Sequence, residues 1–218
     1  MNKKILLGLL VGVAASVVCG CGKKEDNTAK FTANPSSVAG QNANDDEDGT
    51  GLMSGKHHIE IVMKDYGTIK VELDADQAPI TVTNFISLAN DGFYDGLTLH
   101  RIIEGFMMQG GDPLGNGTGG SDKEIKGEFT ENGVENNIKH TRGTISMARS
   151  MDMNSASSQF FIMHKDSASL DGKYAAFGYV TDGMDIVDKI CEEAEPTDNN
   201  GTIPASKQPV IQTIKVID

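Results

Sequence analysis

A succession of short apolar runs, separated by glycine-rich or polar turns, most limits how this chain can fold. The runs lie at residues 97–103, 106–109, 144–148, 159–163 and 176–180, and an alternating segment closes the chain at 210–217. Runs of this length suit β-strands, because a helix needs at least about 10 residues. No strand–helix unit repeats between them, so the pattern favours a mostly antiparallel β-structure over a doubly wound sheet.

Two further strands and two helices complete the pattern. Residues 58–63 and 68–73 alternate apolar and polar side chains around a turn at 65–67, which predicts an antiparallel hairpin. Residues 78–90 change to a helical period, with Pro79 suited to the first turn. A second helix is predicted at 184–193. We expect a mainly β domain with seven or eight short strands and two helices.

The N-terminus has the pattern of an export signal. Lys3 and Lys4 precede an uninterrupted apolar or small stretch at 5–18, which is shorter than the roughly 20 residues of a bilayer-spanning helix. The stretch ends in VCGC at 18–21, which resembles the lipobox of bacterial lipoproteins and predicts lipidation of Cys21. A plain secretory signal cleaved near the same point is the alternative. Both interpretations place the mature protein outside the cytoplasm, and lipidation predicts an anchor in a bacterial membrane.

Composition divides the chain into three parts and excludes one class of partner. We expect a lipoprotein signal peptide at 1–20, a disordered polar and acidic tether at 21–56, and a folded domain at 57–218. The chain has 31 acidic and 19 basic side chains, a formal net charge of -12. Because nucleic-acid binding requires basic side chains that neutralise phosphates, nucleic acid is not an expected partner.

Three separated blocks carry the strongest functional signal. They read HRIIEGFMMQGGD at 100–112, GTISMAR with SQFFI at 143–149 and 158–162, and LDGKYAAFG at 170–178. In order and spacing they resemble the cyclophilin-type peptidyl-prolyl cis-trans isomerases, over about residues 59–217. The resemblance implies a closed eight-stranded antiparallel β-barrel capped by two helices, with the active groove on its outside. It implies no metal or organic cofactor, and proline-containing polypeptides as substrates.

The chemistry of prolyl isomerisation indicates which residue types such a groove needs. Rotation of the prolyl amide crosses a barrier of about 18–20 kcal/mol, because the C–N bond loses its partial double-bond character. A catalyst therefore needs only to bind the twisted amide better than either planar isomer. Arg101 suits this role, because its guanidinium offers a rigid fork of donors and stays charged. Gln109 can hold the substrate backbone. By resemblance, the substrate-binding positions are Phe106, Met107, Ala148, Phe161, Leu170 and Tyr174.

Each assignment has an alternative. Arg101 can be a surface salt-bridge residue, and the groove's apolar residues can be plain core. Strand parity separates two faces, with Ile103, Met108 and Phe160 expected inside and their neighbours in the groove. Two other functions use the same fold: a proline-peptide binding module or holdase chaperone, and a non-catalytic lipoprotein scaffold. The intact motif favours an enzyme that assists folding. A closed barrel leaves no free sheet edge, so a monomer is expected.

Two departures from the family pattern affect inhibitor binding. Ser169 stands where a Trp is frequent, and Tyr174 where a His often lines the groove. The Trp supplies an indole donor and a large apolar face that Ser lacks, so we predict weak cyclosporin binding. Tyr174 keeps an aromatic wall, so turnover is expected to survive.

Other polar features are assigned structural roles. His100 and His164 are expected to be hydrogen-bonded structural histidines, and Cys191 to pack a helix. Residues 115–120 satisfy G-x-G-x-x-G, but no strand-to-helix unit surrounds them. We expect a loop beside the groove there instead of a dinucleotide site.

Overall fold

The structure, a computed structural model of the chain, describes residues 51–218. The predicted signal peptide, the lipidation site Cys21 and most of the predicted tether lie outside the described residues. Between residues 51 and 218, no helix is long and apolar enough to cross a membrane.

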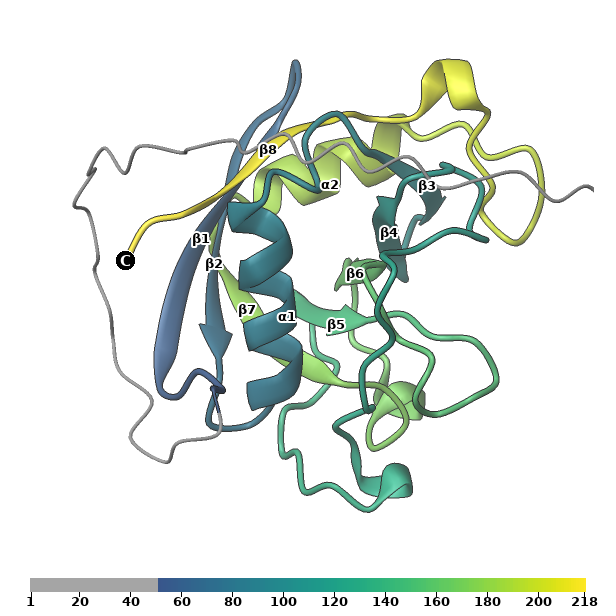
Figure 1. The fold of residues 1–218 in the computed structure, drawn as a ribbon. Helices are drawn as coiled ribbons and strands as arrows, with labels where there is room; N and C mark the ends of the chain where they lie inside the picture. The colour runs from purple at the N-terminus through teal and green to yellow at the C-terminus, as the bar shows by residue number, and fades with distance from the viewer. Residues whose placement is uncertain (1–50) are drawn as a thin grey trace, which may run out of the picture. The chain divides into compact units, whose positions relative to one another are not determined.

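Eight strands and two helices follow one another along the chain (Figure 1). Each lies within a few residues of the bounds expected from the sequence. The strands are β1 (Lys56–Met63), β2 (Gly67–Asp74), β3 (Thr98–Ile103), β4 (Met107–Asp112), β5 (Thr144–Met147), β6 (Phe160–Met163), β7 (Ala176–Asp182) and β8 (Ile211–Val216). The helices are α1 (Pro79–Asn90) and α2 (Met184–Glu193).

The strands form one antiparallel sheet in the order β3-β4-β6-β5-β7-β2-β1-β8. The prediction of a closed barrel is wrong, because the sheet is an open half-barrel whose edges are β3 and β8. The two edges approach each other at an isolated bridge between Thr98 and Val210, next to which the N–H of Gly96 donates to the carbonyl of Ile211 at 2.8 Å. Beyond that bridge the outer side of β3 is occupied by another segment, since the N–H of Ile203 donates to the carbonyl of His100 at 3.0 Å.

Helix α1 packs against β2 and β8 and lies across the front of the sheet in Figure 1. Pro79 stands in its first turn, as predicted, and the N-cap residue Ala78 has no side chain that can accept a hydrogen bond. The buried carboxylate of Glu128 accepts the N–H groups of Ile80 and Thr81 at 2.9 and 2.8 Å instead. A distant acid thus satisfies the free N–H groups of this helix.

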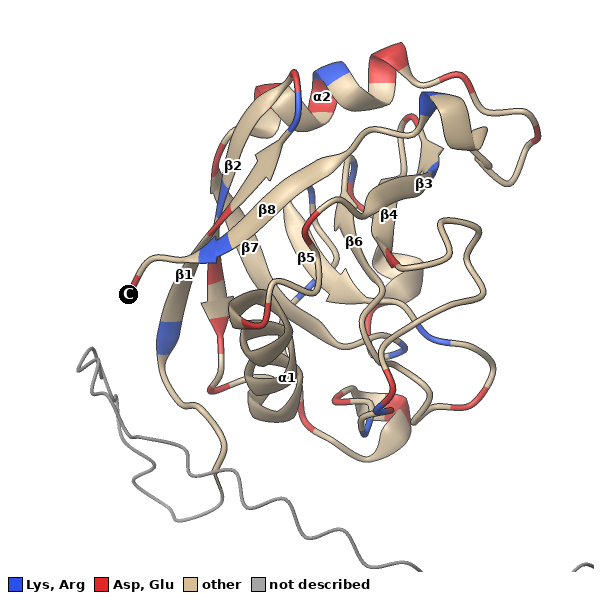
Figure 2. Cartoon of the chain, turned by 45° about the horizontal axis from the view of Figure 1, so that its top comes forward, with Lys and Arg blue, Asp and Glu red and all other residues tan. Residues whose placement is uncertain are grey.

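Helix α2 packs against β2 and β4. It buries Val187, Ile190 and Cys191, and its outer face carries mostly acidic side chains (Figure 2). Burial raises the pKa of the Cys191 thiol to about 12. The predicted packing role of this cysteine is confirmed.

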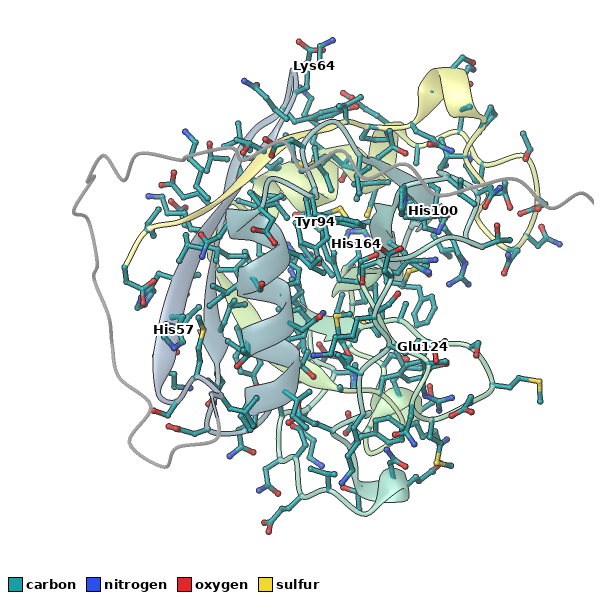
Figure 3. All side chains as sticks on the ribbon, viewed as in Figure 1. His57, Lys64, Tyr94, His100, Glu124 and His164 are labelled. Atoms are coloured by element: carbon teal, nitrogen blue, oxygen red, sulfur yellow. The ribbon has the colours of Figure 1, made fainter. Side chains whose placement is uncertain are left out.

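Two separate apolar clusters occupy the two faces of β4 and β6. The interior cluster includes Met108 and Phe160, and the ring of Phe160 packs edge-on against Phe85 and against the fully buried Tyr94 (Figure 3). The outer cluster contains Met107, Phe161 and Met163, with Ile103, Phe106, Ala148, Leu170 and Tyr174 partly buried around them.

Strand parity predicts most of this division. Met108 and Phe160 lie inside, as expected. The expected interior position of Ile103 is wrong: this residue is directly opposite Met107 in the β3–β4 register, and opposed residues share a face of a sheet. The irregularities of β3 lie before Arg101, and from Arg101 to Ile103 the register is regular. Alternation therefore holds there and places Ile103 on the same face as Arg101, the groove face.

Candidate active site

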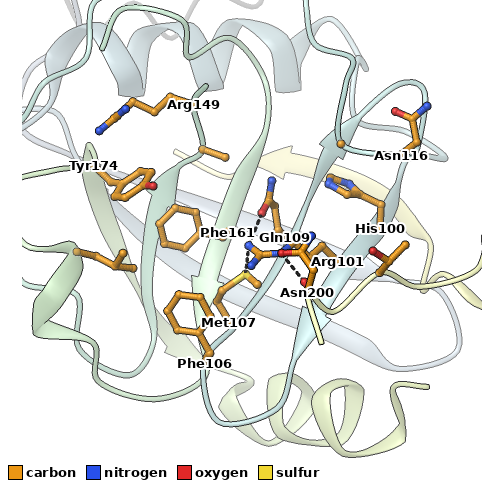
Figure 4. Close-up of a pocket in the computed structure, with 14 residues that line it drawn as sticks. His100, Arg101, Phe106, Met107, Gln109, Asn116, Arg149, Phe161, Tyr174 and Asn200 are labelled. Carbon is orange, nitrogen blue, oxygen red and sulfur yellow. Dashed lines mark hydrogen bonds between the residues drawn. The ribbon is translucent and has the colours of Figure 1, made fainter. Parts of the chain in front are cut away.

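A cavity of about 440 Å³ opens beside the outer cluster (Figure 4). It gathers every residue that the sequence suggested as catalytic or substrate-binding: Arg101, Phe106, Met107, Gln109, Ala148, Phe161, Leu170 and Tyr174. Residues that the sequence analysis did not assign to the groove complete the lining: His100, Asn116, Gly117, Arg149, Asn200 and Thr202. Segments far apart in the chain therefore converge on one concave site.

Arg101 lies on β3, opposite Gln109 on β4. Its Nη1 donates to Oε1 of Gln109 at 3.2 Å, and its Nε donates to the main-chain oxygen of Asn200 at 2.7 Å. Partial burial lowers the pKa of Arg101, while Tyr174 and Asp198 act in the opposite direction. A guanidinium remains protonated at any working pH, so the cavity holds a fixed positive charge. Neither contact uses Nη2.

Gln109 connects this charge to the glycine-rich loop. Its Nε2 donates to Oε1 of Gln159 at 2.9 Å, and Nε2 of Gln159 donates to the carbonyl of Gly119 at 2.7 Å. The loop at 115–120 lies beside the groove, as expected, and Gly117 lines the cavity. The amide chain fixes which atom of Gln109 faces the guanidinium, because each amide nitrogen must donate and each oxygen must accept.

Phe161 and Met107 form the apolar floor. Phe161 is 5 % exposed, and its ring meets that of Tyr174 edge-on, with centroids 5.8 Å apart. His140 stacks on Phe161 from behind at 6.0 Å. Its two ring nitrogens lie 3.2 Å from Oδ1 of Asp171 and 3.1 Å from Oγ of Ser146. Burial lowers the pKa of His140, so the ring is neutral near pH 7.

Arg149 forms a second cationic wall that the sequence analysis did not single out. Its guanidinium carbon lies 4.8 Å from the ring centroid of Tyr174 and 5.0 Å from that of Phe129. Nε and Nη2 both donate to the carbonyl of Lys173, at 3.1 and 2.9 Å. The available sequence signal for Arg149 was its position in the second motif, directly after the predicted substrate-binding residue Ala148.

The two histidines differ from each other. His164 has the expected structural role, because its Nδ1 accepts the N–H of Gly105 at 2.8 Å and its Nε2 lies 3.1 Å from Asp188. His100 is 4 % exposed and lines the cavity, and among residues 51–218 its two ring nitrogens have no hydrogen-bond partner (Figure 3). The expectation of a hydrogen-bonded His100 is therefore wrong, and burial lowers the pKa of this residue.

Comparison with known proteins agrees with the geometry. A sequence model described as "Cyclophilin type peptidyl-prolyl cis-trans isomerase/CLD" matches residues 58–216. The chain is 42% identical over 163 residues to peptidyl-prolyl cis-trans isomerase A of Dickeya dadantii, covering 69% of this chain and 80% of that protein. It is 47% identical over 125 residues to peptidyl-prolyl cis-trans isomerase B of Bacillus subtilis, covering 57% and 84%.

Solved structures show the same architecture. A Cryptosporidium parvum cyclophilin-type isomerase superposes with a TM-score of 0.66 at 29% identity, covering 75% of this chain and 99% of that one. The half-barrel, the groove on its outer face and the sequence similarity together define a cyclophilin fold. The chain belongs to the cyclophilin-type peptidyl-prolyl cis-trans isomerase family and is an enzyme of that activity.

Proposed function

We propose that the cavity isomerises X-Pro bonds without a covalent step, by binding the half-rotated amide better than either planar form. The supporting observation is one fixed guanidinium beside an apolar floor. As the amide twists, its nitrogen becomes pyramidal and its lone pair becomes a hydrogen-bond acceptor. Arg101 supplies the donor, and its Nη2 is not engaged by Gln109 or Asn200. A donor that acts only on the twisted state raises kcat.

The apolar floor is the proposed seat for the proline ring. Met107 and Phe161 are held from behind by buried neighbours, so the floor does not have to form when substrate arrives. Phe106, Leu170, Ala148 and Tyr174 surround it. Gln109 presents an amide to the substrate backbone. A second structure of the Cryptosporidium parvum relative, with 30% identity, was solved in the presence of the dipeptide Ala-Pro. This supports proline-containing polypeptides as substrates here.

The proposed setting is outside the cytoplasm. The N-terminal sequence supports a lipoprotein of a bacterial membrane, with Cys21 as the lipidated residue and the tether holding the domain away from lipid. The domain is proposed to assist the folding of secreted or surface proteins. It is proposed to act as a monomer although the sheet is open, because segment 198–203 covers the outer edge of β3.

Two substitutions of one residue test the catalytic proposal. Arg101→Ala removes the donor, so kcat/KM on a proline tetrapeptide should fall about 10²–10³-fold, as when one donor to developing charge is lost. Arg101→Lys keeps the charge but not the fork, so it should recover only part of the rate. Circular dichroism should remain that of the wild type. Full activity of Arg101→Ala would exclude the mechanism, and tight peptide binding by a wild type without turnover would favour the holdase alternative.

The location is tested separately. Cys21→Ser should move the protein from the membrane fraction to the soluble fraction of bacterial cells and abolish labelling with a radioactive fatty acid. Unchanged membrane association and labelling would exclude Cys21 as the anchor.

A further inference from the structure

The segment 198–203, between α2 and β8, runs along the outer edge of β3. The N–H of Ile102 donates to the carbonyl of Gly201 at 2.8 Å, and Thr202 forms an isolated antiparallel bridge with Arg101. This segment belongs to none of the eight strands of the sheet. The segment is therefore a loop that lies alongside β3, the strand that carries Arg101.

The loop presents one carbonyl to the guanidinium. Nε of Arg101 donates to the main-chain oxygen of Asn200 at 2.7 Å, which is shorter than the 3.2 Å from Nη1 to Gln109 (Figure 4). The next residue, Gly201, has a φ of +84°, and a Cβ there would stand 2.4 Å from Cγ1 of Ile103. The carbonyl thus has its direction because a glycine follows it in a left-handed conformation.

Asp198 organises this turn. Its Oδ1 accepts the N–H groups of Asn200 and Thr202, both at 3.0 Å, and its Oδ2 accepts the hydroxyl of Thr202 at 2.9 Å. Its main-chain oxygen accepts the N–H of Gly201 at 3.1 Å. These donors, Thr202 first among them, lower the pKa of the exposed Asp198 carboxyl. The side chain is ionised at neutral pH and remains an acceptor on both oxygens.

We propose that Asp198 is a positioning residue for the isomerase reaction. By fixing the turn, it places the carbonyl of Asn200 on Nε of Arg101 and so fixes the plane of the guanidinium. Gln109 holds the same group from the other side. Nε is held by Asn200 and Nη1 by Gln109 and the sulfur of Met107, so Nη2 is left to act on the substrate without reorganising at the moment of reaction. The inference rests on the catalytic role proposed for Arg101.

The test compares three substitutions in the full chain. Asp198→Ala removes both acceptor oxygens, so kcat should fall about tenfold while KM stays within about twofold, because only the transition state loses stabilisation. Asp198→Asn keeps one acceptor oxygen and should recover most of the rate. Asp76→Ala is the matched control: Asp76 is an exposed acid whose Oδ1 accepts the N–H of Gly55 at 2.7 Å, away from the groove. Its activity should equal that of the wild type.

A spectroscopic measurement separates positioning from general damage. The chain has three arginines, Arg101, Arg142 and Arg149, so their Nε–Hε resonances can be assigned by single substitutions. The Arg101 signal should exchange slowly with water in the wild type and at least about tenfold faster in Asp198→Ala, because its acceptor moves. The other two signals should not change.

The outcomes distinguish the two proposals. If Arg101→Ala loses activity but Asp198→Ala keeps both the wild-type kcat and the slow Nε–Hε exchange, the inference about Asp198 is overturned and the catalytic proposal stands. A fall in kcat with unchanged Arg101 exchange also overturns it. If Arg101→Ala itself keeps full activity, the catalytic proposal fails, and the positioning role fails with it.

Discussion

Strands β4 and β6 carry two clusters of the same residue types on opposite faces. Inside, Met108 and Phe160 pack with α1 and a set of aromatic rings. Outside, Met107 and Phe161 are almost as buried, at 1 and 5 % exposure, yet they form the floor of an open cavity. Burial therefore does not separate core from site here. What separates them is the neighbour: a helix covers the inner face, whereas an arginine and a loop border the outer one.

The comparison shows how a site can be apolar and stable at once. His140 stacks on Phe161 of the outer cluster and is itself held by Asp171 and Ser146. The aromatic rings of the outer cluster are therefore fixed although no helix between residues 51 and 218 covers them. Residues adjacent in sequence consequently differ in what they contribute: the inner one to the free energy of unfolding, the outer one to substrate binding. The predictions below test that division.

The largest effect is expected inside. Phe160→Leu removes edge-on contacts with Phe85 and Tyr94, each worth about 0.5–1.5 kcal/mol beyond area burial. The free energy of unfolding should fall by about 2 kcal/mol, while kcat/KM per folded molecule stays within twofold. Urea unfolding and a coupled isomerase assay measure the two quantities. A tenfold loss of activity would contradict the claim that the inner face contributes to stability and not to substrate binding.

The same change one residue later should reverse the pattern. Phe161→Leu alters the floor, so kcat/KM should fall about tenfold, equivalent to about 1.4 kcal/mol of transition-state binding. The loss of stability should be smaller than in Phe160→Leu, because this ring faces the cavity. Equal stability losses with unchanged activity would show that the outer face is ordinary core.

A smaller effect depends on pH. Burial lowers the pKa of His140 below its usual 6.5, so the unfolded chain binds a proton more readily than the folded one. The free energy of unfolding should therefore decline as the pH falls through this region, and His140→Asn should decline less. Urea unfolding at about pH 7.5 and about pH 5.5 measures both slopes. Identical slopes would exclude His140 as a contributor.

The smallest effect is the expected response to cyclosporin. Ser169 does not line the cavity and offers no indole, so inhibition should be weak. Titration of the drug in the isomerase assay checks this, and nanomolar inhibition would refute it. Ser169→Trp should strengthen inhibition if the missing side chain is the cause.

The sequence predicted local structure well, because short alternating runs and turn glycines act locally. Both helices and the β1–β2 hairpin follow from the spacing of the apolar residues and from the turn residues between them. The openness of the sheet did not follow, since it depends on segment 198–203 taking the edge of β3, a contact between residues about 100 apart in sequence. The role of Glu128 as the acceptor for the first N–H groups of α1 could not be predicted either, because Glu128 is far from this helix in the sequence.

The site divides in the same way. Residues within the motifs could be named from the sequence, and the structure brings them together in one cavity. Asn200 and His140 could not be assigned, because they act through a carbonyl and a stacked ring that no local pattern reveals. Arg149 could have been suspected from its place in the second motif, but its cation–π contacts could not be predicted. The prediction for Ile103 was wrong although β3 is regular there, because residues two apart share a face and Ile103 therefore lies on the face of Arg101.

Exchange NMR on an Ala-Pro peptide tests the central claim most directly, because one experiment gives both the affinity of the peptide and the rate of cis–trans exchange on the enzyme. Arg101→Ala should bind the peptide within about threefold of the wild type and catalyse exchange at least about a hundredfold more slowly, since the donor acts on the twisted amide alone. Wild-type exchange by the variant, or a loss of affinity as large as the loss of rate, would contradict this account.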